Sequence, residues 1–221
     1  MNHTLINLNK IQQEIHLKIG EINSIIKIPK IIAVSKTFSM DKILPIINSG
    51  HIDFGENKVQ EAVNKWEVLK NDHNQINLHM IGKLQKNKAK HTVRLFDYIH
   101  SLDNIRLAEA IANEEIRQKK KMKIFIQINI GNENQKNGIA INELNSFYDM
   151  CVNNLKLNII GFMCIPPSDK NCSYYFNEMK KITSKFKMKE LSMGMSGDYL
   201  EALTYGSTFL RIGSKIFGER N

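Results

Sequence analysis

Short apolar runs alternate with amphipathic segments along almost the whole chain, and this alternation limits the possible folds more than any other feature. Eight runs have the length and apolar content of buried strands: residues 30–36, 51–57, 77–84, 97–103, 123–130, 157–165, 189–195 and 208–214. The segments between them carry apolar residues three or four positions apart, as helices do, and include residues 58–70, 104–120, 141–154 and 173–186. Repeated β-α units of this kind predict an α/β fold with a parallel sheet.

About eight such units in a chain of 221 residues predict a closed (β/α)₈ TIM barrel. We expect a single domain over residues 1–221, because 42% of the residues are hydrophobic, enough for one large core, and no compositional break divides the chain. An additional N-terminal helix, over about residues 3–26, precedes the first strand. The alternative is an open, doubly wound sheet.

The composition excludes several classes of protein. No apolar run approaches the roughly 20 residues that cross a bilayer, and the first residues lack the apolar centre of a signal peptide. We therefore expect a cytoplasmic protein that makes no membrane contact. The three cysteines, Cys151, Cys164 and Cys172, have no paired metal-ligand spacing, so we expect neither a disulfide framework nor a metal site.

The net charge of +9 raises the question of nucleic-acid binding. Lysines are spread along the chain, and the densest basic run, residues 117–123, lies where a helix is expected to end and complements its dipole. No basic motif is interleaved with aromatic residues. We therefore expect no nucleic-acid partner.

The first predicted strand ends on a lysine, in the sequence IIAVSKTF. Side chains alternate along a strand, so Ile32, Val34 and Lys36 share one face. If that face points into the barrel, the Lys36 amine lies at the end of the barrel where this fold forms its active sites. Apolar neighbours there would favour the neutral amine, the form that attacks a carbonyl to give a Schiff base. The alternative is a lysine that simply extends to solvent.

Two turns near the C-terminal end have the composition of anion sites. Ser196, Gly197 and Asp198 follow the seventh predicted strand and begin a helix, where backbone amides and a hydroxyl can meet an anion. Gly213 and Ser214 follow the eighth strand, where the missing Cβ allows close approach to the backbone. Phosphate sites after the seventh and eighth strands recur in these barrels. Ordinary capped turns are the alternative.

Arg211 lies two residues before Gly213 and shares its face. An inward arginine needs an acceptor, since burying an unpaired charge is costly. A phosphorylated cofactor with a pyridine nitrogen would supply one, and arginine, which keeps its proton, would leave that nitrogen largely unprotonated. An ion pair with a barrel carboxylate such as Glu56 is the alternative.

Six motifs, in this order over nearly the whole chain, together resemble the pyridoxal-phosphate homeostasis proteins, single-domain relatives of the alanine racemase N-terminal barrel: AVSKT, FGENKVQEA, HMIGKLQKNK, GFMCIP, LSMGMSGDYLEA and GSTFLRIGSKIFGER. The resemblance implies a barrel that holds pyridoxal 5′-phosphate (PLP) as an internal aldimine, a Schiff base on Lys36. It implies that Ser196, Gly213 and Ser214 hold the phosphate and that Arg211 faces the pyridine nitrogen.

Three further matches to the family lie at predicted strand ends: Asn57, His79 and Met163. There they either line the cofactor pocket or serve packing and hydrogen bonding of the scaffold. The chain departs from common family forms at Leu78, which an aromatic residue often replaces, and at Lys83, where proline is frequent. These two changes affect at most the rim of the expected pocket.

The resemblance implies a role in intracellular PLP homeostasis and cofactor supply rather than robust catalysis. Racemisation needs an acid/base group on each side of the cofactor, and Lys36 provides only one. In the racemase relatives a second domain of a partner chain supplies a tyrosine, and this chain is too short to carry that domain. Tyr174, Tyr175, Tyr199 and Tyr205 fall in predicted helices instead.

We therefore assign no catalytic residue and expect PLP as the bound molecule, exchanged with free amino acids or with PLP-dependent client enzymes. We expect a monomer or a weak dimer. A PLP-dependent racemase or related amino-acid enzyme of narrow range is the main alternative. A Schiff-base aldolase that acts on phosphorylated sugars without a cofactor is the next, because it would use the same lysine and phosphate site.

Overall fold

Eight parallel strands form a closed barrel in the computed structural model, which describes residues 2–22, 27–133, 135–168 and 171–219. The strands follow one another in sequence order, and β8 pairs with β1 to complete the barrel. They are β1 (Lys30–Val34), β2 (Asp53–Glu56), β3 (Asn77–Met80), β4 (Tyr98–Leu102), β5 (Lys123–Ile128), β6 (Ile159–Cys164), β7 (Glu190–Ser192) and β8 (Phe209–Ile212). The predicted (β/α)₈ TIM barrel is confirmed, and the open sheet is wrong.

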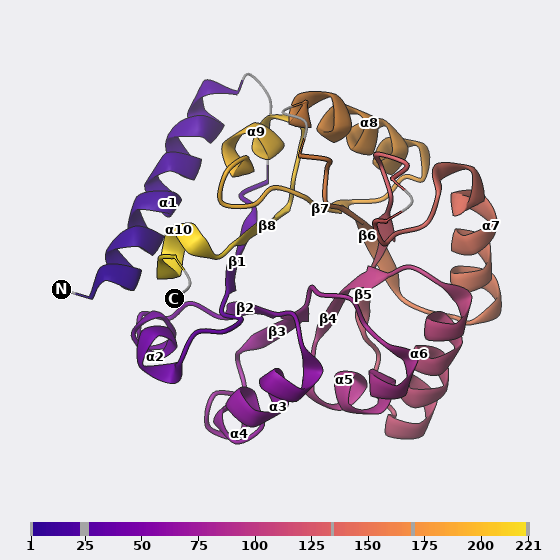
Figure 1. Ribbon diagram of the computed structural model, residues 1–221, viewed down its shortest axis with the longest axis horizontal. Coiled ribbons are helices and arrows are strands. Elements are labelled where there is room, and N and C mark those ends of the chain that lie inside the picture. Colours follow the sequence, from indigo (N-terminus) through magenta and orange to yellow (C-terminus); the bar gives the residue numbers. More distant parts are fainter. Residues whose placement is uncertain (1, 23–26, 134, 169–170, 220–221) are drawn as a thin grey trace.

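Helices surround the barrel on its outside (Figure 1). They are α1 (His3–Glu21), α2 (Met40–Asn48), α3 (Val59–Trp66), α4 (Leu69–Asp72), α5 (Ala89–Leu95), α6 (Ile105–Gln118), α7 (Leu144–Asp149), α8 (Cys172–Lys185), α9 (Tyr199–Thr204) and α10 (Ser214–Phe217), with the 3₁₀ turns η1 (Lys86–Lys88) and η2 (Ile141–Glu143) and the π-helical segment η3 (Met150–Asn154). The segment 58–70, predicted as one helix, forms α3 and α4.

Local sequence explains where these helices begin and end, as α6 illustrates. The side chain of Asn104 accepts a hydrogen bond of 2.9 Å from the backbone amide of Leu107 and so caps the first turn. Leu107 and Ile111 lie one turn apart on the face buried against the barrel. Lys119 takes a left-handed conformation, with φ of 51°, and ends the helix.

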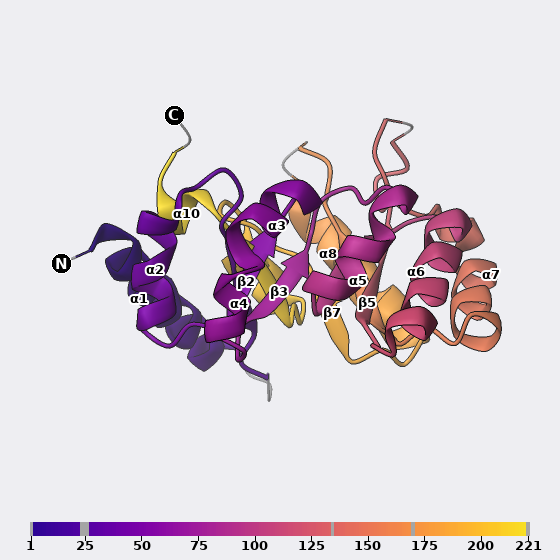
Figure 2. The same ribbon diagram turned by 90° about the horizontal axis from the view of Figure 1, so that it is seen from below.

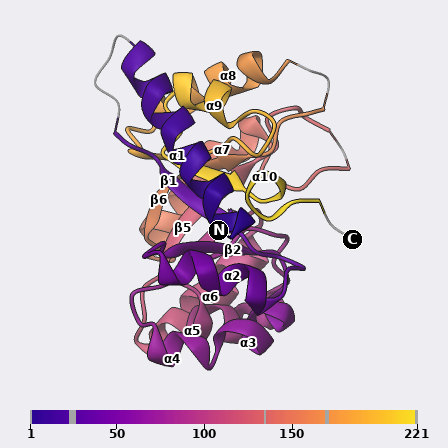
Figure 3. The ribbon, with the colours of Figure 1, turned by 90° about the vertical axis from the view of Figure 1, so that its left-hand side faces the viewer.

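The N-terminal helix α1 covers the side of the barrel beside β1 and β8. The helix after β8, α10, has only four residues, and α1 lies against α2, α9 and α10 where a longer final helix would otherwise lie (Figure 3). Leu8, Ile11 and Ile15 are its buried apolar residues. The predicted additional helix is therefore present. It ends at Glu21, and residues 23–26 of the predicted range lie outside the described residues.

Apolar side chains fill two separate layers. The larger layer lies between the strands and the helices, and the smaller one lies inside the barrel and contains Ile32, Val34, Tyr98, Phe125, Met163 and Phe209. The segments that leave β5 and β6 lie on the same side of the barrel as α10, the upper side in Figure 2. This is the carboxyl end of the strands, where the smaller apolar layer inside the barrel ends and polar side chains begin.

None of the helices in the described part of the chain combines the length and the apolar character needed to cross a bilayer.

Candidate functional site

A cavity of about 270 Å³ opens at the carboxyl ends of the strands. Its lining comes from the ends of β1, β2, β3, β6, β7 and β8 and consists of Val34, Lys36, Asn57, Ile81, Ile165, Met195, Ser196, Gly197, Arg211, Gly213 and Ser214. Six of the eight residues predicted for the site are in this set. Among the described lining residues two are cations and none is a carboxylate, so the cavity favours an anionic ligand.

Lys36 projects into this cavity from a turn rather than from the strand itself. Strand β1 ends at Val34, two residues earlier than the predicted strand, because Lys36 and Thr37 turn away towards α2. Thr37 has φ of 67°, a left-handed conformation that β-branched residues rarely adopt. Strained backbone of this kind persists only where neighbouring groups hold it in place.

Helix α3 supplies those neighbouring groups. The Lys65 ammonium donates to the backbone oxygen of Ser35 at 2.9 Å, and Glu61 Oε1 accepts from the Thr37 amide at 2.5 Å. Lys65 and Glu61 also pair with each other at 2.6 Å. The backbone on both sides of Lys36 is therefore tied to one helix, which fixes the direction in which the lysine leaves the turn.

Glu56 completes this support from beneath. It is fully buried on the outer face of β2, where its Oε1 accepts from Ser35 Oγ at 2.8 Å and from Trp66 Nε1 at 3.1 Å. Burial raises the pKa of Glu56, while Lys65, at 3.3 Å, opposes that rise together with the two hydrogen bonds. Glu56 thus belongs to the support of the lysine turn and not to the cavity.

Ser196 joins the two turns predicted to bind an anion. Its hydroxyl oxygen accepts from the backbone amides of Gly213 and Lys215, both at 3.3 Å. The two amides and the hydroxyl therefore meet at one place beside the cavity. A Cβ added to Gly197 would meet no atom within 4 Å, so this side of the cavity is open. Converging amide and hydroxyl donors in an open recess are what a phosphate group requires.

Arg211 closes the floor of the cavity. Its side chain points into the barrel and is only 4% exposed. Its Nη1 donates to Ser192 Oγ at 2.7 Å, and its Nη2 donates to the backbone oxygen of Cys164 at 2.8 Å. Burial lowers the pKa of Arg211, but a guanidinium starts so high that it keeps its proton.

The suggested ion pair between Arg211 and Glu56 is wrong. The two side chains lie on opposite faces of the barrel wall, because Glu56 shares its face with Phe54 of the outer layer.

His79 and Met163 do not line the cavity. Both are fully buried inside the barrel, where Met163 packs in the inner apolar layer and His79 contacts Asp53 and His100 at 3.0 Å each. Each is the last residue but one of its strand, but its side chain lies inside the barrel and not in the cavity lining. Of the two roles left open for them, packing and hydrogen bonding of the scaffold fits these contacts.

Three lining residues were not predicted from sequence: Ile81, Ile165 and Met195. Ile81 lies two residues after His79, and Ile165 lies two residues after Met163, so the alternation of strand side chains could have found both. Leu78 and Lys83, where the chain departs from family forms, are not in the lining.

No tyrosine is found in the cavity lining of the described residues. Tyr199 lies on the outside of the barrel, where its hydroxyl contacts Glu14 of α1 and Lys215, the latter at 2.8 Å. Glu14 also pairs with Lys215 at 2.9 Å. This group joins α1 to α9 and α10, directly behind the turn that carries Ser196.

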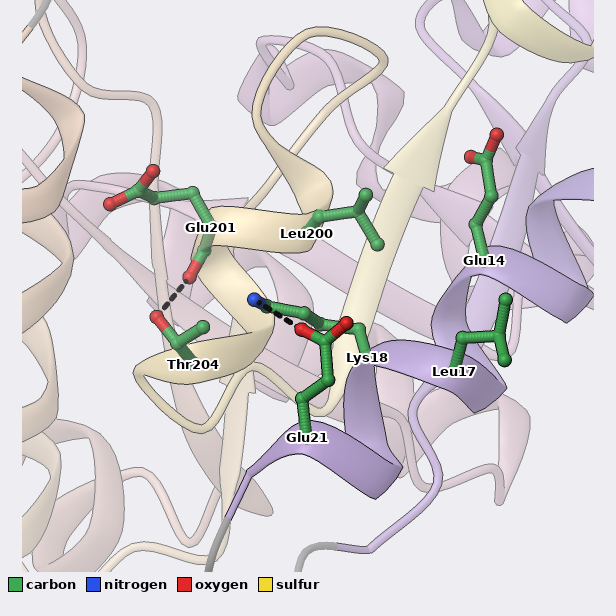
Figure 4. A pocket seen from close by; sticks show the side chains of 7 residues that line it. All are labelled: Glu14, Leu17, Lys18, Glu21, Leu200, Glu201 and Thr204. Carbon is green, nitrogen blue, oxygen red and sulfur yellow. Dashed lines mark hydrogen bonds and ion pairs between the residues drawn. The ribbon is translucent and has the colours of Figure 1, made fainter.

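A wider cavity, about 580 Å³, lies between α1 and α9 (Figure 4). In it Lys18 pairs with Glu21 at 2.9 Å, and the Thr204 hydroxyl donates to the backbone oxygen of Glu201. It contains no strand-end residue. The smaller cavity at the strand ends is the better candidate, because converging functional groups define a site more sharply than volume does.

The described residues contain no group of three or more His, Cys, Asp or Glu side chains arranged to hold a metal ion.

Comparison with known proteins gives a consistent family. The family model described as alanine racemase, N-terminal domain, matches residues 6–221. The pyridoxal phosphate homeostasis protein of Haemophilus influenzae is 34% identical over 97% of this chain and 95% of that protein.

Solved structures agree with this result. The structure of PipY from Synechococcus elongatus with PLP bound has 28% identity and a TM-score of 0.81, over 94% of this chain and all of that one. Alanine racemase from Corynebacterium glutamicum has the same fold at 14% identity, with a TM-score of 0.65 over 96% of this chain and 61% of that one.

Proposed function

The chain belongs to the pyridoxal phosphate homeostasis proteins, within the alanine racemase N-terminal domain family, and on that premise we propose that it binds PLP covalently through Lys36. We further propose that residues 1–221 act as one domain whose role is PLP homeostasis and cofactor supply. The relative PipY, whose structure contains PLP, supports this assignment.

The observation that carries the proposal is the convergence of three kinds of group on one small cavity. An amine, a set of amide and hydroxyl donors, and a buried guanidinium all line it, and no carboxylate of the described residues does. PLP has three matching parts: an aldehyde, a phosphate and a pyridine nitrogen. Each part would meet a group of complementary chemistry, so the residues present fit the cofactor.

Each residue then has a defined task. The Lys36 amine would attach the cofactor, and Ser196, with Gly213 and Ser214, would hold the phosphate. Arg211 would meet the ring nitrogen, and Asn57 lines the same cavity. When bound, PLP supplies an aldehyde that exchanges between amines and a ring that withdraws electrons.

The same lining favours a carrier over a robust enzyme. Lys36 can give and take a proton, whereas Arg211 keeps its proton and therefore does not act as a base. No tyrosine, histidine, cysteine or carboxylate of the described residues lines the cavity as a second acid/base group. An open site with one exchangeable amine suits transfer of PLP to free amino acids or to client enzymes.

The decisive experiment is an absorbance spectrum of the purified protein before and after borohydride reduction, followed by peptide mass mapping. We expect an absorbance band of the lysine-bound cofactor that reduction bleaches, with the reduced adduct on the peptide that contains Lys36. The Lys36→Ala variant should lack the adduct and keep the fold. A wild-type protein that remains colourless after addition of PLP would contradict the proposal.

A further inference from the structure

A continuous row of buried polar groups crosses the inside of the barrel and ends at the cavity. It consists of Asp53, His79, His100, Ser192 and Arg211, from β2, β3, β4, β7 and β8, and is called the Asp53–Arg211 relay below. Asp53 contacts His79 at 3.0 Å, His79 contacts His100 at 3.0 Å, and His100 contacts Ser192 at 2.9 Å. Arg211 contacts Ser192 at 2.7 Å. The site described above uses only the last member.

With both histidines neutral and Asp53 ionised, the hydrogen atoms of the relay have one self-consistent order. Arg211 has donors only, so Ser192 Oγ accepts from it, and the Ser192 hydroxyl donates its own hydrogen to His100 Nδ1. A neutral His100 then carries its proton on Nε2 and donates to His79 Nδ1. His79 in turn carries its proton on Nε2 and donates to the Asp53 carboxylate. Four hydrogen bonds therefore run in one direction, from the cation to the anion.

The surroundings of the relay favour this neutral state of both histidines. His79 stacks on Tyr98 and His100 stacks on Phe125, each with ring centroids 4.3 Å apart, and both imidazoles are fully buried. Burial lowers the pKa of His79 and places that of His100 well below its usual range. Protonation of either histidine would add a charge inside this apolar layer, which is costly. Two neutral histidines that carry their protons on Nε2 satisfy every hydrogen bond of the relay.

Charged groups around the relay are few and lie mainly at its ends. Asp53 lies 3.4 Å from Lys30, and its backbone oxygen contacts His51 Nε2 at 3.0 Å. The charge of Asp97 also acts on His79, and that of Asp198 acts on Arg211. The Cys164 thiol near Arg211 is neutral, because burial raises its pKa to about 12. The relay thus joins a carboxylate near the amino ends of the strands to a guanidinium at the carboxyl ends.

We propose that Asp53, His79 and His100 are positioning residues that act on the cofactor through Arg211. By fixing the Ser192 hydroxyl as an acceptor, they hold the guanidinium in one orientation and aim its remaining N–H groups at the cavity. This proposal rests on the proposed function, because the group that Arg211 would meet is the PLP ring nitrogen. It also gives His79 a role without contact to the cofactor.

The first test determines which nitrogens of His79 and His100 carry a proton in the ligand-free full chain. Long-range ¹H–¹⁵N NMR of the imidazole nitrogens distinguishes the two neutral tautomers and the charged form. We expect His79 and His100 both to carry a proton on Nε2 only, and to keep that state from pH 7.5 to pH 5.5. A proton on Nδ1 of either ring at pH 7.5 would overturn the directed order.

The second test measures the cofactor. We expect His100→Phe to weaken PLP binding about tenfold and to shift the absorbance of the bound cofactor, because Ser192 then loses the partner that orients it. Asp53→Asn, a near-isosteric change remote from the cavity, should weaken binding less but in the same direction. Ser101→Ala is the control: Ser101 is buried next to His100 in sequence, but its hydroxyl has no hydrogen-bond partner among the described residues.

The outcomes separate the two proposals. If the wild type binds PLP and both relay variants match Ser101→Ala in affinity and spectrum, the positioning role is overturned and the proposed function stands. If the wild type takes up no PLP, both fail. If His100→Phe does not fold, Asp53→Asn decides the question, because a loss of affinity and a spectral shift from that distance need the connection through the relay.

Discussion

The two buried histidines of the relay make stability depend on pH with a predictable sign. Burial lowers the pKa of His79 and of His100 in the folded chain, whereas in the unfolded chain each returns to about 6.5. Below about pH 6.5 the unfolded chain therefore binds protons that the folded chain does not. Their contribution to stability is complete above this pH and is lost as pH falls, by up to about 1.4 kcal/mol per pH unit for each histidine.

Urea unfolding at pH 7.5, 6.5 and 5.5 measures the slope, which is the change in the free energy of unfolding per pH unit. His100→Phe should be less stable at pH 7.5 but lose less stability on acidification, while Ser101→Ala, a change at a neighbouring buried residue that does not titrate, should keep the wild-type slope. Glu56 acts with the opposite sign, because its raised pKa makes stability fall as pH rises above about 4.5. Equal slopes for wild type and His100→Phe would show that His100 is not buried in its neutral form.

Gly161 of β6 is required by close packing rather than by its backbone angles. A Cβ at this position would lie 1.8 Å from the backbone oxygen of Glu190 in β7, which cannot move without breaking the barrel. We expect Gly161→Ala to cost about 3 kcal/mol in unfolding free energy. Gly20→Ala is the matched control, because a Cβ in α1 meets no atom of the described residues within 4 Å and should stabilise the helix by roughly 0.5–1 kcal/mol. Chemical denaturation of both variants checks that Gly161→Ala lowers the free energy of unfolding and that Gly20→Ala raises it.

Helix α3 determines how firmly the Lys36 turn is held, although none of its residues lines the cavity. Glu61 accepts from the Thr37 amide and from Lys65, so Glu61→Gln replaces a charged acceptor with a weaker neutral one at both contacts. We expect PLP affinity to fall roughly tenfold in an absorbance titration, with the circular dichroism spectrum unchanged.

The control for this prediction is Glu67→Gln. Glu67 follows α3 directly, but it is 47% exposed and pairs with Arg94, which is 51% exposed. Pairs of this kind contribute little, so PLP affinity should stay at the wild-type value. If Glu61→Gln binds PLP as tightly as Glu67→Gln does, the turn is fixed by its own conformation and not by α3.

Sequence patterns predicted the barrel and most of the cavity lining for one physical reason. In a closed parallel barrel all carboxyl strand ends meet at one rim, so residues that follow different strands become neighbours without any knowledge of contacts. Lys36, Ser196 and Arg211 were found in this way. The same rule gave the two turns predicted to bind an anion, which the Ser196 hydroxyl joins in the structure.

The depth at which each inward side chain lies in the barrel depends on the register between strands, which a single sequence does not contain. Arg211 lies beside Ile32, and Ser192 lies beside Met163 and Phe209, so the depth of each inward side chain follows from the stagger of the barrel. This is why the sequence left His79 between the cavity lining and the scaffold, and why His100 and Ser192 were not singled out. The location of α1 depended on the shortness of α10, which no local pattern in α1 reveals.

The lining of the cavity as a unit leads to a prediction about chirality. Racemisation removes the α-proton on one face of the bound amino acid and returns a proton on the other, so it needs two acid/base groups. Of the described lining residues only Lys36 exchanges protons readily, since Arg211 does not. The PLP-loaded protein incubated with L-alanine should therefore release D-alanine no faster than free PLP does, as measured by chiral chromatography. Formation of D-alanine at about 1 per second or faster, abolished by Lys36→Ala, would instead establish an enzyme and require a second proton donor from outside the described lining.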